Sequence, residues 1–392
     1  MEDNGGLALR KICIITSRYP NEFDKTAMAF VQQFVWELAN KGIQCTVICP
    51  IPLNIKLREG MRLPGKIIEK TNKDKEVTVY FPKFLGYGQK NFGMIKTAQY
   101  TLESFNKAVR GVLKTFSQRP DVIYGHFITP SGIVAARLGR EFGIPSFLAY
   151  GESSPWSIYN LGVERVKKEL ETINGVIAVS KKNKDELLQL GVVAKDKIGV
   201  FPNGIRLEHF YPRDKEDSRR RFNLPQDAFI ACFVGHFIER KGVKYVVNSV
   251  DSINNVYGIY AGKGSGKPHS KRNKDLFVGL VAHEDLPWFY SAADVFVLPT
   301  LNEGCCNAII EAMACGLPII SSDLPFNDDL LDDTNSIRVD PNNVGEIKDA
   351  IKALYDNKDK LQALCKGSIE KSKSLTLDNR AVRIIGFIEE QM

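Results

Sequence analysis

Short apolar runs alternate with amphipathic stretches along most of this 392-residue chain. The apolar runs have the length of buried strands, and the amphipathic stretches, such as residues 29–40, repeat apolar residues with a helical period. Strands that alternate with helices form parallel sheets covered by helices, so the pattern predicts an α/β fold. The predicted strands are residues 12–16, 45–49, 77–81, 122–124, 146–150 and 176–179 in the first half and residues 229–234, 258–261, 276–278, 294–298 and 318–321 in the second.

The same alternation occurs twice, which predicts two similar domains. Between the two halves, Pro202-Asn203-Gly204 is a turn sequence and residues 213–221 are densely charged. This composition is typical of a connection between domains. Because ligands of parallel α/β sheets bind at the carboxyl ends of the strands, the loops that follow the predicted strands are the first places to look for function.

Two glutamates separated by seven residues, Glu303 and Glu311, follow a predicted strand of the second half. The pattern predicts a loop to Gly304 and a helix over residues 305–315, which Gly316 ends. The first N–H groups of a helix have no partners within it and the dipole is positive there, so this segment predicts a phosphate site. Glu311, about 10 Å from the helix start at ~1.5 Å per residue, would lie near a ribose.

Both glutamates also have a simpler interpretation, because acids near a helix start gain a few tenths of a kcal/mol and helix glutamates are usually solvated. We favour the functional interpretation since Glu311 is surrounded in sequence by apolar residues, where an unpaired carboxylate is unfavourable. Cys305 and Cys306 stand at the predicted helix start, which stabilises thiolates. No nearby His or Asn completes a nucleophile, so we interpret them as small residues that let a ligand approach the backbone.

A second anion site is predicted after the strand 229–234. Gly235 and His236 follow this strand, and Arg240-Lys241-Gly242 precedes a helix that runs to about Val250. Cations at a helix start oppose the dipole, so Arg240 and Lys241 are better explained by an anion, such as a diphosphate, between them and the helix. The alternative is that both are solvated surface cations. The helix starts near Gly242 and Gly304 could meet one diphosphate from two sides.

Two common nucleotide-binding patterns are absent. The segment Gly262-Lys263-Gly264-Ser265-Gly266-Lys267 is similar to a Walker loop, but Ala261 stands where the first glycine is needed and Pro268 where Ser or Thr would hold Mg²⁺. The first predicted strand leads into residues 16–21, which contain no glycine, so the dinucleotide fingerprint is missing too. We interpret residues 262–266 as a flexible loop beside the ligand cleft.

Three residues of the first half, His126, Tyr150 and Glu152, lie at or just after the ends of predicted strands. Their loops should face the cleft, which makes them candidates for contact with a reacting group. His126 has an equally good alternative as a satisfied structural histidine.

The basic residues are unevenly distributed: residues 1–200 carry a net charge of +10 and residues 201–392 a net charge of −3. The excess lies in residues 51–96, where Lys and Arg alternate with the aromatic residues Phe81, Phe84, Tyr87 and Phe92. Basic residues with apolar anchors suit an anionic membrane surface or a pyrophosphate-bearing lipid. A solvated surface loop is an equally good interpretation. The basic residues are Lys56, Arg58, Arg62, Lys66, Lys70, Lys73, Lys75, Lys83, Lys90 and Lys96.

Composition points to a cytosolic protein. The eight cysteines show no Cys-x-x-Cys spacing, so disulfides and a structural metal are not expected. The first ten residues are polar, and no apolar run approaches the ~18 residues that span a bilayer.

Taken together, these residues resemble the retaining nucleotide-sugar glycosyltransferases of family 4, whose GT-B fold has two Rossmann-like parallel-sheet domains facing a cleft. The resemblance covers nearly the whole chain and is strongest in residues 176–180, 201–205, 234–235 together with 241–242, 293–296 and 303–318. It implies an acceptor-binding domain over residues 1–203, a donor-binding domain over residues 204–372, and a final helix within residues 373–392 that crosses back to the first domain.

The resemblance also implies roles for individual residues. Glu311 would hold the ribose of the donor nucleotide, Glu303 would contact the transferred sugar, and Lys241 would neutralise the leaving phosphate. The catalytic candidates are Glu303, Lys241, Glu152, Tyr150 and His126. The donor-binding candidates are Gly235, His236, Arg240, Lys241, Gly279, Leu280, Glu303, Gly304, Cys305, Cys306, Asn307 and Glu311.

Three positions depart from the family pattern. His236 stands where many members have arginine, Tyr150 where members often have histidine, and Met28 where a glycine is common. A histidine is only partly charged near pH 7. These departures leave open which group contacts the reacting sugar, for which Glu152 becomes a candidate, and they change the expected acceptor loop at residues 17–26.

The sequence therefore predicts a retaining glycosyltransferase that moves a hexose-type sugar from a nucleotide diphosphate sugar to a glycan or lipid-linked glycan. We expect it to need no metal or cofactor, to act in bacterial surface polysaccharide synthesis, and to contact an anionic membrane peripherally through residues 51–96. Nucleic acid is not an expected partner. The alternatives are a nucleotide-sugar epimerase or phosphorylase of the same fold and a non-catalytic nucleotide-sugar-binding protein.

Overall fold

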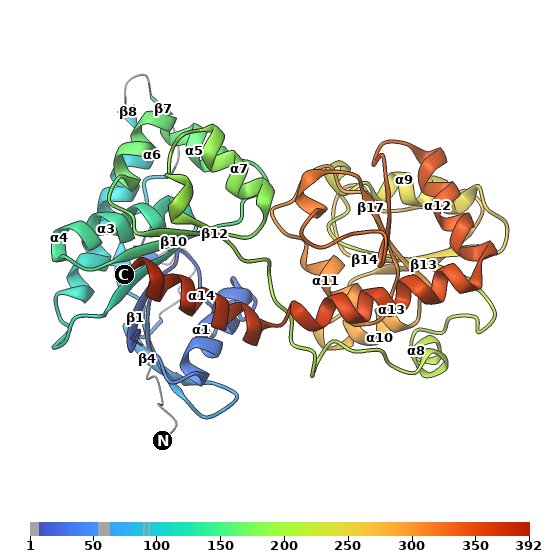
Figure 1. Cartoon of the computed structure of the whole chain (residues 1–392), viewed down its shortest axis with the longest axis horizontal. Helices are drawn as coiled ribbons and strands as arrows, with labels where there is room; N and C mark the ends of the chain where they lie inside the picture. Colours follow the sequence, from blue (N-terminus) through green and yellow to red (C-terminus); the bar gives the residue numbers. More distant parts are fainter. Residues whose placement is uncertain (1–7, 54–62, 89–90, 93–94) are drawn as a thin grey trace. The chain divides into compact units, whose positions relative to one another are not determined.

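The computed structural model describes residues 8–53, 63–88, 91–92 and 95–392 (Figure 1). The chain forms two compact units. Unit 1 comprises Met1–Val179, Asn183–Phe201 and Ala381–Met392, and unit 2 comprises Ser180–Lys182 and Pro202–Arg380. Apart from the short segment Ser180–Lys182, the chain passes into unit 2 after Phe201 and returns to unit 1 after Arg380.

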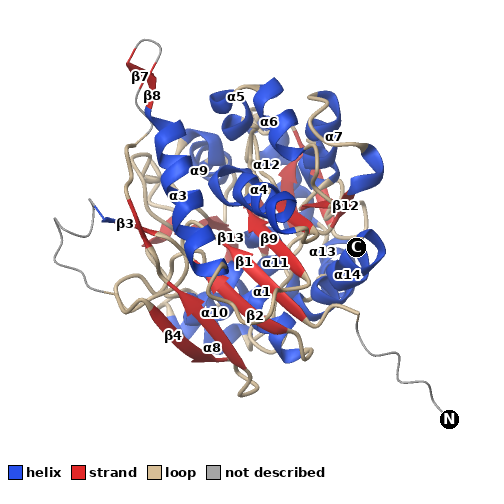
Figure 2. Ribbon diagram, turned by 90° about the vertical axis from the view of Figure 1, so that its left-hand side faces the viewer, coloured by secondary structure: helices blue, strands red, loops and turns tan. Residues whose placement is uncertain are grey.

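The centre of unit 1 is one sheet with the strand order β12-β11-β10-β9-β1-β2-β5-β4. Its strands are β1 (Lys11–Ile15), β2 (Gln44–Ile48), β4 (Lys66–Lys70), β5 (Glu76–Tyr80), β9 (Val122–His126), β10 (Ser146–Tyr150), β11 (Gly175–Ala178) and β12 (Ile198–Val200). All neighbours are parallel except β4, which pairs antiparallel with β5 at the sheet edge (Figure 2). Two short pairs lie outside this sheet: β3 (Ile51–Pro52) with β6 (Lys83–Phe84), and β7 (Asn91–Phe92) with β8 (Ile95–Lys96).

Helices cover both faces of this sheet. They are α1 (Ala29–Asn40), α3 (Thr97–Leu113), α4 (Ile133–Phe142), α5 (Trp156–Leu161), α6 (Val163–Leu170), α7 (Lys181–Gln189) and α14 (Leu377–Gln391). Because side chains of a strand alternate between faces, Ile12 and Ile14 are buried with α1 and the end of α14, whereas Cys13 and Ile15 are buried with α3, α4 and α6. The α14 residues in this core are Ala381, Ile384, Ile385 and Ile388.

Unit 2 contains a parallel sheet in the order β15-β14-β13-β16-β17-β18. Its strands are β13 (Phe229–Val234), β14 (Val256–Ala261), β15 (Asp275–Gly279), β16 (Val295–Leu298), β17 (Ile319–Ser322) and β18 (Ser336–Val339). Its helices are α8 (Lys215–Arg221), α9 (Val243–Asp251), α10 (Leu286–Ser291), α11 (Asn307–Ala314), α12 (Val344–Asp356) and α13 (Lys358–Ser374). The strand order reverses between β13 and β16, and ligands of such sheets bind beyond the carboxyl ends of the strands at that point.

The structure confirms the predicted α/β class with parallel sheets. Every predicted strand is present with boundaries within two residues, and α1 has the predicted limits. The prediction lacks β4, β12 and β18 and the two-residue strands β3, β6, β7 and β8. β4 is an edge strand whose exposed and partly buried residues alternate without a fully buried position. Among the described residues, no helix has the length and apolar character needed to cross a membrane.

Candidate functional site

The loops after β13 and β16 are held together by backbone contacts in unit 2. The loop after β13 contains the short helix η3 (Glu239–Lys241) and ends at Gly242, whose φ is +73°. A Cβ at Gly242 would lie 2.3 Å from the carbonyl oxygen of Pro299, so only glycine fits. The N–H of Leu301 donates to the carbonyl of Arg240 at 2.8 Å. Arg240 and Lys241 are therefore fixed against the loop that carries Glu303.

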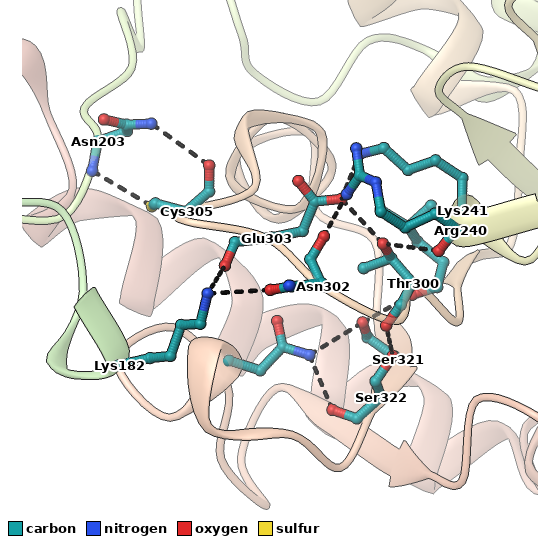
Figure 3. A network of polar contacts seen from close by, with 12 residues as sticks. Lys182, Asn203, Arg240, Lys241, Thr300, Asn302, Glu303, Cys305, Ser321 and Ser322 are labelled. Carbon is teal, nitrogen blue, oxygen red and sulfur yellow. Dashed lines mark hydrogen bonds and ion pairs between the residues drawn. The ribbon is translucent and has the colours of Figure 1, made fainter. Parts of the chain in front are cut away.

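Three side chains converge on one carboxylate oxygen of Glu303 (Figure 3). Oε1 of Glu303 lies 2.5 Å from Nζ of Lys241 and 3.0 Å from Nη1 of Arg240, and it accepts a hydrogen bond from the Thr300 hydroxyl at 2.8 Å. Arg240 also donates to the carbonyl of Asn302. The side chains of Glu303 and Lys241 are only 12% and 15% exposed, so water screens this pair weakly.

This pairing changes the explanation of the two cations. The sequence predicts an anion between Arg240, Lys241 and a helix start, and in the structure the carboxylate of Glu303 lies against both cations. Two positive charges face one negative charge, so the trio retains a net positive charge. An anionic ligand group beside these three residues would neutralise the remaining positive charge.

Helix α11 begins at Asn307, two residues later than predicted, because Cys306 has extended backbone angles of φ −87° and ψ 106°. No side-chain hydrogen bond caps this helix start, which makes it a candidate site for an anionic ligand group. The helix ends before Gly316, whose φ of +81° is the predicted left-handed termination. Glu311 is therefore the fifth residue of the helix, about 6 Å from its start at ~1.5 Å per residue rather than about 10 Å.

Glu311 lies in a largely buried helix, in which Ile309, Ile310, Ala312 and Met313 are buried. Burial raises the pKa of Glu311 to about 7, while a hydrogen bond from Tyr290 opposes this shift. The Tyr290 hydroxyl donates to Oε2 of Glu311 at 2.8 Å. A ligand that donates hydroxyl hydrogen bonds to this carboxylate would favour its charged form.

The two cysteines before α11 are not activated. Burial raises the pKa of Cys305 to about 12 and that of Cys306 to about 11. Both therefore remain thiols near neutral pH, although the helix start would favour a thiolate. This leaves the interpretation of small residues beside the backbone and no nucleophilic cysteine at this position.

A buried polar cluster supports the loop that carries Glu303 (Figure 3). Thr300, Ser321, Ser322 and Asn327 are all completely buried. The Ser322 hydroxyl donates to the Thr300 carbonyl at 2.5 Å, and Asn327 Nδ2 donates to the Ser322 carbonyl at 2.8 Å. These residues and Tyr290 are not among the site residues predicted from the sequence. The sequence feature that could have indicated the cluster is the pair of serines at the end of a predicted strand.

The glycine-rich segment 262–266 is tied down rather than free, which corrects its interpretation as a flexible loop. A Cβ at Gly262 would lie 1.9 Å from the carbonyl oxygen of Gly235. The N–H of Gly266 donates to the carbonyl of Phe237 at 2.8 Å. The glycines are thus explained by close packing of this segment against the loop after β13.

The other predicted donor residues also lie at the carboxyl edge of the unit 2 sheet. Gly279 is the last residue of β15, and Leu280 after it is 69% exposed. His236 is exposed and follows Gly235 in the loop after β13. Gly304 is buried directly before Cys305.

In unit 1, the predicted catalytic residue Tyr150 ends β10 and is completely buried. Its hydroxyl donates to Oε2 of Glu186 at 3.2 Å, and Asn183 donates to the same oxygen at 3.0 Å. Asn183 also donates to the carbonyl of Glu152 at 2.9 Å. Burial raises the pKa of Glu152, whose Oε2 accepts from the N–H of Ser157 at 3.3 Å. Asn183 and Glu186 are not among the site residues predicted from the sequence.

His126 ends β9 and is 8% exposed. Its ring lies 4.6 Å from that of Phe127 and 5.4 Å from that of Phe30, and Nδ1 lies 3.4 Å from the Tyr124 hydroxyl. The ring is thus packed among aromatic groups at the carboxyl edge of the unit 1 sheet.

The basic segment 51–96 is only partly described. Lys56, Arg58, Arg62 and Lys90 lie outside the described residues. Phe81 is buried in the core and the Phe84 ring packs 5.4 Å from that of Phe105, so neither is an exposed anchor as predicted. Tyr87 and Leu85, in contrast, are 49% and 50% exposed.

Comparison with known proteins agrees with this architecture. A family model described as Glycosyltransferase Family 4 matches residues 29–209, and one described as Glycosyl transferases group 1 matches residues 214–371. The putative teichuronic acid biosynthesis glycosyltransferase TuaC of Bacillus subtilis is 29% identical over 356 residues, which cover 87% of this chain and 88% of that protein.

Solved structures show the same fold. Sucrose-phosphate synthase from Thermosynechococcus elongatus superposes with a TM-score of 0.75 at 21% identity, over 97% of this chain and 98% of that chain. Anabaena HepE in complex with UDP-glucose superposes with a TM-score of 0.66 at 15% identity, over 97% and 99% of the two chains. With the two domain matches on either side of residue 210, these similarities make this chain a glycosyltransferase of the GT-B fold, similar to family 4.

Proposed function

We propose that this chain transfers a hexose-type sugar from a nucleoside diphosphate sugar to a glycan or lipid-linked glycan, with retention of the anomeric configuration. The observation that carries the proposal is the convergence of Lys241, Arg240 and Thr300 on Glu303. The two cations and the uncapped start of α11 would bind the diphosphate. Glu303 would accept hydroxyl hydrogen bonds from the sugar through Oε2, the oxygen that these three contacts do not use.

The donor nucleotide would be held further along α11. The carboxylate of Glu311 would accept hydrogen bonds from the two ribose hydroxyls, with its other partner, Tyr290, fixing its position. The HepE complexes contain UDP, glucose or UDP-glucose. UDP-glucose is therefore the first donor to test, within a panel of other nucleotide sugars.

The chemistry would rest on charge stabilisation. As the bond between the sugar C1 and the phosphate oxygen breaks, negative charge grows on the diphosphate, where Lys241 and the helix N–H groups would stabilise it. Glu303 is occupied by three donors, which makes it a poor nucleophile. We therefore propose that the acceptor oxygen bonds to C1 on the face that the diphosphate leaves, and that its proton passes to a phosphate oxygen of the leaving group.

The proposal includes metal independence, because Lys241, Arg240 and a helix start supply positive charge where a divalent cation would otherwise act. Transfer is expected to continue at the same rate in excess EDTA. Loss of activity in EDTA with recovery on adding Mg²⁺ would contradict this part of the proposal.

The test of the function is product analysis with the full chain. A thermal-shift screen against nucleotide sugars identifies the donor, because a ligand that binds the folded state raises its stability. NMR of the product then gives the anomeric configuration. Conversion of the donor without an acceptor would indicate an epimerase, a requirement for inorganic phosphate a phosphorylase, and binding without turnover over a broad acceptor panel a binding protein.

For the acceptor, we propose a glycan of a bacterial surface polysaccharide, with peripheral contact to an anionic membrane. The name of the Bacillus relative, which refers to teichuronic acid biosynthesis, supports the first part. The second part is supported by the exposed Leu85 and Tyr87 beside Lys83. Co-sedimentation with anionic liposomes at low salt tests it, and absence of binding would exclude it.

A further inference from the structure

Asn203 bonds to the segment that leads into α11 through both its backbone and its side chain (Figure 3). Its backbone N–H donates to Sγ of Cys305 at 3.4 Å. Its side-chain Nδ2 donates to the carbonyl of Cys305 at 3.4 Å and to Oδ1 of Asn307 at 2.8 Å. Asn203 thus contacts the residues on both sides of the N-cap Cys306: Cys305 before it and Asn307, the first residue of the helix.

These contacts fix the orientation of two amide groups. A backbone carbonyl can only accept a hydrogen bond, so the Asn203 atom that faces Cys305 must be its NH₂ group. The same NH₂ group meets Asn307, so the Asn307 atom there must be its oxygen. The NH₂ group of Asn307 is consequently the end that remains for a ligand, and it is a donor, as an anionic diphosphate or a sugar hydroxyl requires.

The residues on both sides of Asn203 in the sequence contact residues 375–380, which lie far along the chain. Ile205 donates to the carbonyl of Leu375 at 2.8 Å and accepts from the N–H of Leu377 at 3.0 Å. A Cβ at Gly204 would lie 2.7 Å from the backbone nitrogen of Leu377, so this contact requires glycine. Arg380 donates to the carbonyl of Pro202 at 3.0 Å. The backbone of Asn203 is therefore fixed before any ligand binds.

We propose that Asn203 is a positioning residue for the nucleotide-sugar donor, acting through Asn307. This role of Asn203 rests on the proposed function, in which the donor is the ligand at the start of α11. Asn203 holds the Asn307 amide with its NH₂ group toward the ligand and keeps the Cys305 segment against the fixed turn at Pro202–Ile205. A binding group held in place before the ligand arrives loses less freedom on binding.

The test is a double-mutant cycle on UDP binding with the full chain, measured by calorimetry. Asn203→Ala and Asn307→Ala are each expected to raise the Kd roughly 5-fold to 30-fold, and the double variant is expected to lie within about 2-fold of Asn307→Ala. Asn203→Asp is expected to be worse than Asn203→Ala, because an acid at this position draws the Asn307 NH₂ group away from the ligand. Asn254→Ala, an exposed position of the same unit, is the control with unchanged Kd.

Two results would overturn the inference. One is a Kd of Asn203→Ala within 2-fold of the wild type. The other is a Kd of the double variant raised by the product of the two single-variant factors, as for independent residues. Unfolding temperatures without ligand separate positioning from general destabilisation. If Asn203→Ala does not fold, Asn203→Ser replaces it in the same cycle. Failure of the wild type to bind any nucleotide would contradict the proposed function instead, so the two outcomes are distinguishable.

Discussion

The ammonium group of Lys241 lies 2.5 Å from Oε1 of Glu303, with both side chains largely buried. The cation assigned to the leaving phosphate and the carboxylate assigned to the sugar are thus paired with each other within the protein. A diphosphate that binds beside them shares Lys241 with Glu303, and the binding strength depends on how that competition is resolved.

Replacing Lys241 by alanine should lower kcat/KM for the donor by roughly 100-fold to 1,000-fold, the usual effect of removing one group that stabilises transition-state charge. The fold should survive, because Arg240 and Thr300 still contact Glu303. Steady-state kinetics with a saturating acceptor measures the effect. Lys244→Ala is the matched control, since Lys244 is an exposed lysine of the adjacent helix α9. Equal losses in both variants would show a general charge effect rather than a specific one.

Replacing Glu303 by glutamine should separate binding from transfer. Without the carboxylate, Lys241 and Arg240 lose the negative charge that they share, so UDP should bind as tightly as to the wild type or several-fold more tightly. Transfer should fall by at least about 100-fold, because the amide oxygen would face the three donors and leave the NH₂ group, which cannot accept hydrogen bonds, toward the sugar hydroxyls. Calorimetry with UDP and a transfer assay measure the two effects. Weaker UDP binding in Glu303→Gln would show that the carboxylate helps to organise the phosphate site instead of competing for it.

How much of this site can be predicted depends on whether a contact is local in sequence. The alternation of apolar residues predicts β10 and α1 at their observed limits, and Gly316 predicts the end of α11. The pairing of Lys241 with Glu303 needs the strand order, in which β13 and β16 are neighbours, and no local pattern contains that information. The contact of Tyr290 with Glu311 is equally hard to predict, because it joins two helices, α10 and α11, that are separated in the sequence.

The start of α11 shows a different limit. The sequence predicts that the helix begins at Cys305, directly after the loop that ends at Gly304, whereas the structure keeps Cys306 extended. Hydrogen bonds from Asn203, about a hundred residues earlier in the chain, hold this segment in place. Helix propensity alone cannot reveal such a tertiary contact, so boundaries are predicted less well than the elements themselves.

Gly242→Ala should destabilise unit 2 by about 2 to 4 kcal/mol. The new Cβ would meet the Pro299 carbonyl at 2.3 Å, and alanine at a φ of +73° adds roughly 1 kcal/mol of backbone strain. Chemical denaturation measures the change. Gly386→Ala is the contrasting variant: it lies in α14 with no atom within 4 Å of the added Cβ, so it should stabilise the chain by about 0.5 to 1 kcal/mol. Similar effects at both sites would contradict the packing described for Gly242.

The double variant Cys305→Ser, Cys306→Ser should retain activity within about 3-fold. The raised pKa values of about 12 and about 11 keep both groups as thiols, which are poor nucleophiles. Serine at position 305 can still accept the hydrogen bond from Asn203. Iodoacetamide at pH 7 should accordingly leave the wild-type rate unchanged. Rapid inactivation that the double variant escapes would assign a reactive thiol to this site.

Glu311 should make stability and nucleotide binding depend on pH. Its pKa is about 7 in the folded chain against an ordinary value of 4.5, so between these values the folded state binds more protons than the unfolded state. The free energy of unfolding that protonated Glu311 contributes at low pH is therefore lost as the pH rises from about 4.5 to about 7. Glu311→Gln does not titrate, so it should be as stable as the wild type near pH 4.5 and more stable by about 1 to 3 kcal/mol above pH 7.

Nucleotide binding should change in the opposite direction. The ribose hydroxyls need the charged carboxylate, so the affinity of the wild type for UDP should rise as the pH increases through about 7, and the loss caused by Glu311→Gln should be largest at pH 8. Denaturation and calorimetry at pH 5, 6, 7 and 8 measure both curves. Glu171→Gln, at an exposed glutamate of unit 1, should show neither trend. If the differences in unfolding free energy and in UDP affinity between Glu311→Gln and the wild type stay constant over this range, Glu311 does not titrate there.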